Sequence, residues 1–177
     1  LRALWRDVTG SVLSIGEGHG RASQGGGYRD YFPAWGRYVR MEYDKGWGGS
    51  LPAEIYGDVR SMPAVPTESF DCVFCIYVLE HVDDVEAGVA EIWRVLKRGG
   101  VLIFGLPLDY IYHGGPMDFW RFSEAGTRHL LKRFRIDSLL ACGEDHQFAI
   151  DPRLEFYGPQ VQNGPLGYVG AGIKPAA

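Results

Sequence analysis

The chain has 177 residues, of which 46% are hydrophobic and 23% charged, and its formal net charge at pH 7 is −4. This length and composition indicate one globular domain over residues 1–177. The net charge gives no general attraction for nucleic acid, and the apolar runs are too short for a signal peptide or transmembrane helix, so we expect a cytoplasmic protein with neither a nucleic-acid nor a membrane partner.

The first predicted strand covers residues 11–15 and runs into three spaced glycines, Gly16, Gly18 and Gly20. A strand that ends in a glycine cluster indicates a tight turn. Because glycine has no Cβ, the backbone of such a turn can pass close to a ligand. The triple glycine at 25–27 disfavours a regular helix after the turn, so we expect a loop or a short irregular helix there.

Three further strands are predicted over residues 37–43, 54–59 and 70–78. The first alternates polar and apolar side chains, as a half-buried strand does. The last is almost wholly apolar, which is typical of a strand buried on both faces of a parallel sheet. It contains Cys72 and Cys75, which point to opposite faces of a strand and therefore cannot share one metal ion. We expect buried thiols and no metal site.

The second half of the chain is predicted to hold a helix over 83–96, a strand over 101–106, a helix over 123–134, and strands over 135–142 and 167–173. Asp83 or Asp84 can cap the first helix, and Ser123 can cap the second. Gly99 and Gly100 are expected to end the first helix. The alternation predicts an α/β fold with a Rossmann-like, mainly parallel sheet of about seven strands and helices on both faces.

Acidic residues follow the second and third predicted strands, namely Glu42 and Asp58. Right-handed crossovers place the carboxyl ends of parallel strands at one rim, together with the glycine turn. A carboxylate there can accept both ribose hydroxyls, and a second can accept the exocyclic amine of adenine. We therefore predict that Glu42 binds the sugar and Asp58 the base of an adenosine ligand.

Several segments in order resemble a known family: residues 12–20, 57–63, 69–75, 78–82 and 91–100. The family is the class I S-adenosylmethionine-dependent methyltransferases, and within it the small-molecule type 11 branch. The resemblance implies S-adenosylmethionine as cofactor and methyl transfer to a small-molecule acceptor. Residues 112–123 are similar to a subgroup associated with surface sugars or secondary metabolites, which makes those the expected acceptor classes.

The resemblance also implies which residues hold the cofactor. They are Gly16, Glu17, Gly18, Gly20, Glu42, Asp58, Val59, Ile76 and His81. Ser14 stands where this family has an acid for the methionine amino group, and Glu17 is the candidate substitute. His81 is expected to be structural, beside the cofactor.

The loop after the strand at 101–106 carries the candidate groups for the acceptor. If the acceptor is a hydroxyl or an amine, His113 is the best-placed base for its proton. Phe119, Trp120 and Phe122 either line the acceptor pocket or pack in the core, and Arg121 binds an acidic group or forms a surface ion pair.

Two other functions remain open from the sequence. One is a catalytically inactive methyltransferase-like binding module, which the altered first motif favours. The other is an NAD-dependent oxidoreductase that uses the same glycine turn, although it gives Asp58 and the segment 79–81 no role.

Overall fold

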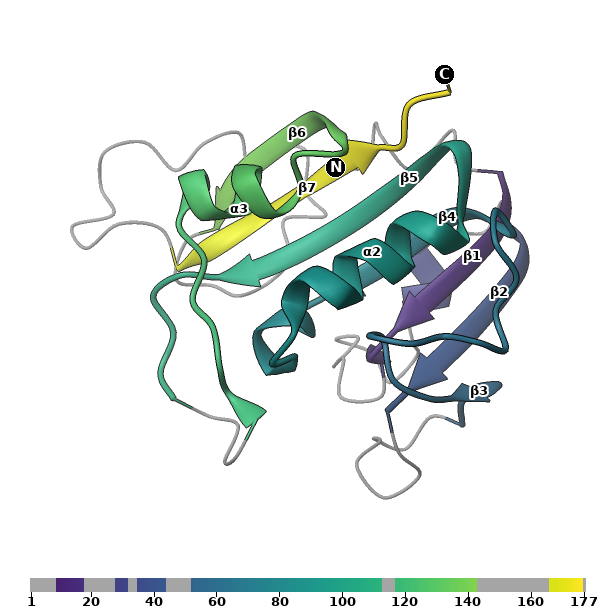
Figure 1. The fold of residues 1–177 in the computed structure, drawn as a ribbon, viewed down its shortest axis with the longest axis horizontal. Coiled ribbons are helices and arrows are strands. Elements are labelled where there is room, and N and C mark those ends of the chain that lie inside the picture. Colours follow the sequence, from purple (N-terminus) through teal and green to yellow (C-terminus); the bar gives the residue numbers. More distant parts are fainter. Residues whose placement is uncertain are drawn as a thin grey trace.

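The computed structural model describes residues 9–17, 28–31, 35–43, 52–112, 117–142 and 166–176. These residues form a seven-stranded sheet in the order β3-β2-β1-β4-β5-β7-β6 (Figure 1). The elements in chain order are β1 (Gly10–Ile15), η2 (Tyr28–Tyr31), β2 (Trp35–Glu42), β3 (Ile55–Tyr56), β4 (Phe70–Ile76), η3 (Leu79–His81), α2 (Val85–Val95), β5 (Leu96–Pro107), α3 (Glu124–Leu130), β6 (Arg135–Cys142) and β7 (Gly167–Ile173).

The sheet is mainly parallel, as predicted. Strands β3, β2, β1, β4 and β5 pair in parallel, whereas β7 runs antiparallel between β5 and β6. The chain builds outward from β1 to β3 and then returns to place β4 on the other side of β1. A reversal of this kind opens a crevice at the carboxyl ends of the two central strands, which is where open α/β sheets bind ligands.

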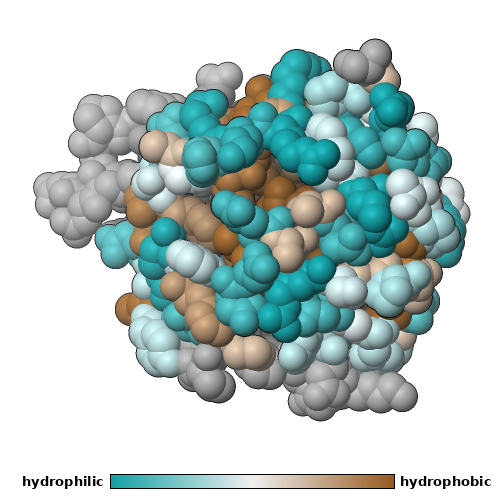
Figure 2. Space-filling view, in the orientation of Figure 1, coloured by the Kyte–Doolittle hydropathy of each residue, from teal (hydrophilic) through white to brown (hydrophobic). Residues whose placement is uncertain are grey.

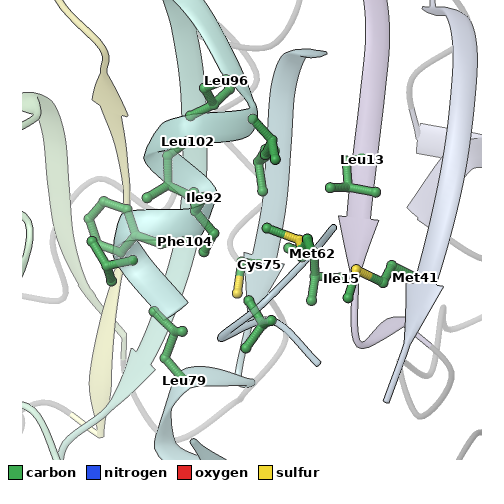
Figure 3. Close-up of a cluster of buried hydrophobic side chains, with 14 of the residues drawn as sticks. Leu13, Ile15, Met41, Met62, Cys75, Leu79, Ile92, Leu96, Leu102 and Phe104 are labelled. Atoms are coloured by element: carbon green, nitrogen blue, oxygen red, sulfur yellow. The ribbon is translucent and has the colours of Figure 1, made fainter. Parts of the chain in front are cut away.

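Two buried clusters lie on the two faces of the sheet. The larger one packs the sheet against α2 and α3, and Figure 3 shows its members converging from β1, β2, β4, β5 and α2. Alternation along β4 places Cys75 in this cluster and Cys72 and Phe74 in the second one. Both thiols are fully buried, and burial raises their pKa. The predicted opposite orientation of the two cysteines is confirmed.

Both α-helices of the described residues pack on the same face of the sheet, in front of it in Figure 1. On that face, Figure 2 shows mostly hydrophilic residues over the outer sides of the helices and apolar residues in a hollow between them. On the opposite face, Tyr28 of η2 contacts Phe74, with ring centroids 4.6 Å apart. The expected α-helices on both faces are therefore seen on one face within the described ranges.

Capping follows the predictions at both helix starts, but not at the end of α2. Asp84 accepts from Ala87 N at 3.0 Å, and Ser123 accepts from Gly126 N at 3.1 Å. The prediction that Gly99 and Gly100 end the first helix is wrong. Helix α2 ends at Val95, and the glycines lie within β5.

The third strand is shorter than predicted, because β3 covers only Ile55–Tyr56. Asp58 therefore lies in a turn beyond the strand, where it forms an isolated bridge with Ser61. Within the described part of the chain, no helix has the length and apolar character needed to cross a membrane. The same residues contain no group of three His, Cys, Asp or Glu side chains that could hold a metal ion.

Candidate active site

Backbone hydrogen bonds bring the carboxyl ends of the parallel strands to one rim. Gly16 N donates to Met41 O at 2.9 Å and so joins the ends of β1 and β2. Gly57 N donates to Glu42 O at 2.9 Å, which places Asp58 beside the end of β2. Tyr77 N donates to Gly105 O at 3.0 Å and joins β4 to β5. The predicted convergence on one rim is observed for Gly16, Glu42 and Asp58.

Position 16 requires glycine for two reasons, its backbone conformation and the close approach of Val78. Its φ is +71°, a backbone conformation that residues other than glycine rarely adopt. A Cβ at Gly16 would lie 2.4 Å from Val78 Cγ2, in the turn that follows β4. Glycine at this position thus permits close packing of the β1 turn against the β4 turn. Gly18 and Gly20 lie outside the described residues.

The Glu17 side chain is buried and accepts hydrogen bonds from two parts of the protein. One carboxylate oxygen accepts from Tyr28 N, and the other accepts from the Tyr38 hydroxyl at 2.5 Å. Burial and the adjacent carboxylate raise the pKa of Tyr38. Glu17 therefore anchors η2 and β2 to the glycine turn. Each oxygen of the Glu17 carboxylate retains a lone pair for one hydrogen bond from a ligand.

Asp58 is held by an arginine that the sequence analysis did not identify. Arg60 Nε lies 3.0 and 2.9 Å from the two carboxylate oxygens, and Arg60 Nη2 lies 2.5 Å from Oδ2. These hydrogen bonds keep the pKa of Asp58 below its usual value. Arg60 Nη1 also pairs with Asp83, just before α2. The Asp58 carboxylate is therefore ionised at neutral pH, and Arg60 fixes its orientation. Because Arg60 occupies most of its lone pairs, the carboxylate can accept about one further hydrogen bond.

The other predicted acid, Glu42, is buried at the end of β2, with 6% of its surface exposed. Two predicted cofactor contacts, Val59 and Ile76, have core side chains. Val59 Cγ1 lies 3.5 Å from where a Cβ on Gly88 of α2 would be, and Ile76 packs in the same way against Gly105 of β5. Any contact of these two residues with a cofactor therefore depends mainly on their backbone groups.

The turn after β4 is joined to the segment that precedes α3. His81 Nδ1 lies 2.6 Å from Met117 O, and because a carbonyl can only accept, Nδ1 carries the proton. The Glu80 carbonyl accepts from Phe119 N at 2.8 Å and from Trp120 N at 3.2 Å. His81 thus acts as a structural link, as expected.

The Glu80 carboxyl is almost completely buried under this link. Burial raises its pKa to about 8, and the nearby Asp118 contributes to the increase. Its Oε1 lies 3.9 Å from His81 Nε2. Glu80 is therefore mostly protonated at neutral pH, which the sequence analysis did not anticipate.

We call residues 108–112 and 117–122 the rim wall, because they lie beyond the carboxyl ends of β4 and β5 (Figure 1). Arg121 holds its two segments together. Its guanidinium pairs with both oxygens of Asp118, at 2.5 and 2.9 Å, and donates to the carbonyls of Tyr110, Ile111 and Trp120. The ion-pair alternative for Arg121 is the one observed.

The aromatic residues of the rim wall divide between core and surface. Phe122 packs in the larger core cluster, whereas Phe119 and Trp120 are exposed. The Trp120 ring nitrogen donates to Val82 O at 2.8 Å, which fixes the indole against the β4 turn. The candidate base, His113, lies outside the described residues.

Sequence comparison with known proteins finds methyltransferases. The family model described as Methyltransferase domain matches residues 31–104. A curated relative, sterol 24-C-methyltransferase ERG6B of Gibberella zeae, is 35% identical over 97 residues. That alignment covers 55% of this chain but only 22% of the relative.

Solved structures share the fold at low identity. A S-adenosylmethionine-dependent methyltransferase from Mesorhizobium loti is 17% identical with a TM-score of 0.62, over 97% of this chain and 94% of that one. The [4+2]-cyclase SpnF is 18% identical with a TM-score of 0.68, over 99% and 79% of the two chains. The chain is therefore similar to the Methyltransferase domain family over residues 31–104, and its sheet has the fold of solved S-adenosylmethionine-dependent methyltransferases.

Proposed function

We propose that this domain transfers the methyl group of S-adenosylmethionine to a small-molecule acceptor. The observation that supports this most is the placement of Gly16, Glu42 and Asp58 at one rim, at the reversal between β1 and β4. In this proposal Glu42 binds the ribose hydroxyls of the cofactor and Asp58 binds the adenine amine. Gly16 and Glu17 lie beside its methionine part.

Methyl transfer from S-adenosylmethionine needs no covalent intermediate with the protein. When bound, the cofactor supplies a sulfonium-activated methyl group, and the protein aligns a nucleophile with it and excludes water. The rim wall stands where an acceptor would approach from the β4 and β5 side. For a hydroxyl or amine acceptor, we propose His113 as the group that takes the proton.

The class of acceptor is open to a direct assay. The curated relative is by its name a sterol 24-C-methyltransferase, which supports a small organic acceptor here. Sugars and secondary metabolites remain the classes suggested by the sequence resemblance. Release of S-adenosylhomocysteine from labelled cofactor, in the presence of each acceptor class, tests transfer itself.

Binding of the cofactor product tests the site. S-adenosylhomocysteine at about 100 times its Kd should stabilise the native protein by about 2.7 kcal/mol, measured as a thermal shift. Asp58→Ala should remove most of this shift. The matched control is Asp71→Ala, because Asp71 is also ion-paired, to Lys97, but lies near the start of β4. No shift in the wild-type protein, or an equal loss in both variants, would contradict the proposal.

One observation favours a second candidate function, a methyltransferase-like module that binds without catalysis. The Glu17 oxygens are already engaged by Tyr28 and Tyr38, and Ser14 stands at the family's acidic position. Such a module would bind S-adenosylhomocysteine, yet release none from S-adenosylmethionine with any acceptor. Turnover with one acceptor would exclude it.

A further inference from the structure

We infer that the methyl acceptor is an uncharged aromatic molecule, which lies against the exposed aromatic surface of the rim wall. This inference rests on the proposed function, because it concerns the acceptor of the same site. It departs from the sugar class that the sequence resemblance suggests.

The rim wall exposes large apolar side chains in two adjacent segments. They are 38% to 75% exposed: Tyr110, Ile111, Tyr112, Phe119 and Trp120. Arg121 binds the carbonyls of Tyr110 and Ile111 on one segment and of Trp120 on the other, so the two segments lie side by side. Large apolar side chains exposed together on adjacent segments of a folded domain commonly mark a binding site. Flat aromatic side chains favour a planar ring as the ligand.

The charges around the rim wall disfavour an acidic acceptor. All five guanidinium hydrogens of Arg121 are directed to protein acceptors, and its charge is balanced by the buried Asp118. Asp109, exposed beside Tyr110, adds a negative charge. Arg121 is the one arginine or lysine among the rim-wall residues, so an anion that binds to these residues would lose hydration without gaining a cationic partner from them.

The titratable groups that the rim wall covers, Glu80 and His81, do not add a positive charge that would attract an anionic acceptor. Glu80 is mostly protonated at neutral pH, so it contributes little charge. The ring of His81 faces Glu80 and the carbonyl of Met117. A sugar, in turn, would need several polar partners at the surface, where the exposed side chains are mainly apolar or aromatic.

The rim wall is also held rigidly in place. Trp120 Nε1 donates to Val82 O, Phe119 N donates to Glu80 O, and Phe122 N donates to Pro107 O at 2.7 Å. These bonds fix the aromatic surface beyond the ends of β4 and β5, on the rim that carries the proposed cofactor site. A surface ordered in advance loses less entropy when a ligand binds.

Calorimetric titration with three naphthalene probes of different charge and with one sugar tests the inference. With the protein saturated by S-adenosylhomocysteine, the probes are 1-naphthol, 1-naphthoate, 1-naphthylmethylamine and methyl glucoside. We expect 1-naphthol to bind at least tenfold more tightly than each of the other three. Tighter or equal binding of the anion, the cation or the glucoside would overturn the inference.

Variants show whether 1-naphthol binds at the rim wall or to exposed apolar residues in general. Ile111→Ser and Phe119→Ser should each weaken the binding of 1-naphthol at least threefold, while the affinity for S-adenosylhomocysteine stays unchanged. The matched control is Leu140→Ser on β6, because Leu140 is also an exposed apolar residue but lies two strands from β5. Equal weakening in the control would overturn the inference. Failure to bind S-adenosylhomocysteine at all would instead contradict the proposed function.

Discussion

At the scale of single residues, Glu80 is a carboxyl group that folding removes almost completely from water. It is 1% exposed, and burial is the main cause of its raised pKa of about 8. In the unfolded chain the same group releases its proton near pH 4.5. The folded state therefore binds the extra proton between these two pH values, and folding becomes less favourable as the pH rises through this window.

We predict that Glu80→Gln flattens this pH dependence. In the wild-type protein, Glu80 lowers the free energy of unfolding by a few kcal/mol between about pH 4.5 and 8, because one pKa unit corresponds to about 1.4 kcal/mol. Glutamine does not titrate, so the stability of the variant relative to wild type should improve steadily with pH. Urea denaturation at pH 5, 6, 7 and 8 measures this.

Glu91→Gln is the control for the sign of the effect. Hydrogen bonds from Arg94 keep the pKa of Glu91 low, so its contribution to stability is lost on acidification. This variant should leave the slope between pH 5 and 8 unchanged. Parallel pH profiles for wild type and Glu80→Gln would refute the burial argument.

The acids of the rim were predicted from the sequence, but their hydrogen-bonding partners were not. Glu42 and Asp58 follow strands, and that position alone places them at the carboxyl rim. Arg60 engages Asp58 from two residues away, and the Asp-x-Arg spacing after a strand is the signal that could have indicated it. The contact between Tyr38 and Glu17 depends on which strands are neighbours, and that follows only from the assembled sheet.

At the scale of elements, the end of α2 depends on a residue far along the chain. Lys174, just after β7, is 6% exposed, and its Nζ donates to Leu96 O at 2.7 Å and to Trp93 O at 3.0 Å. Glu68 lies 3.2 Å away and balances part of the charge. A cation at the carboxyl end of a helix is favoured by the helix dipole and by the unpaired carbonyls there.

We predict that Lys174→Met costs about 2 kcal/mol of unfolding free energy, because buried carbonyls lose a charged donor while the apolar volume is kept. The control is Arg98→Met, since Arg98 also approaches Glu68 but is mostly exposed. It should cost less than about 0.5 kcal/mol. Urea denaturation at pH 7 compares the two, and an equal loss would contradict the capping role.

Helix α2 ends within one residue of the predicted position, and the pairing of Leu96 with β4 explains why Gly99 and Gly100 do not end it. Gly99 and Gly100 suggest a helix end by their own preferences, but Leu96 is already extended, with φ −70° and ψ 135°, and pairs with Phe70 of β4. The long-range pairing overrides the local signal. In contrast, the bounds of β6 and β7 agree with the prediction.

At the scale of the whole molecule, alternating strands and helices were enough to predict a mainly parallel α/β sheet. The insertion of antiparallel β7 between β5 and β6 could not be predicted, since a strand pattern does not specify its neighbours. The small residues of β7 suit this place, because a Cβ at Gly170 would lie 2.2 Å from Ser138 O. Strand order, and with it the site at the β1 and β4 reversal, emerges only from packing.

In the proposed function, one nucleoside lies across the strand ends, with its ribose at Glu42 and its adenine at Asp58. A crystal structure of the protein with S-adenosylhomocysteine tests this most directly. We predict density for the ligand beside Gly16, with the ribose hydroxyls within about 3 Å of the Glu42 carboxylate and the adenine amine at a similar distance from Asp58. A ligand bound elsewhere, or with neither carboxylate in contact, would contradict the account.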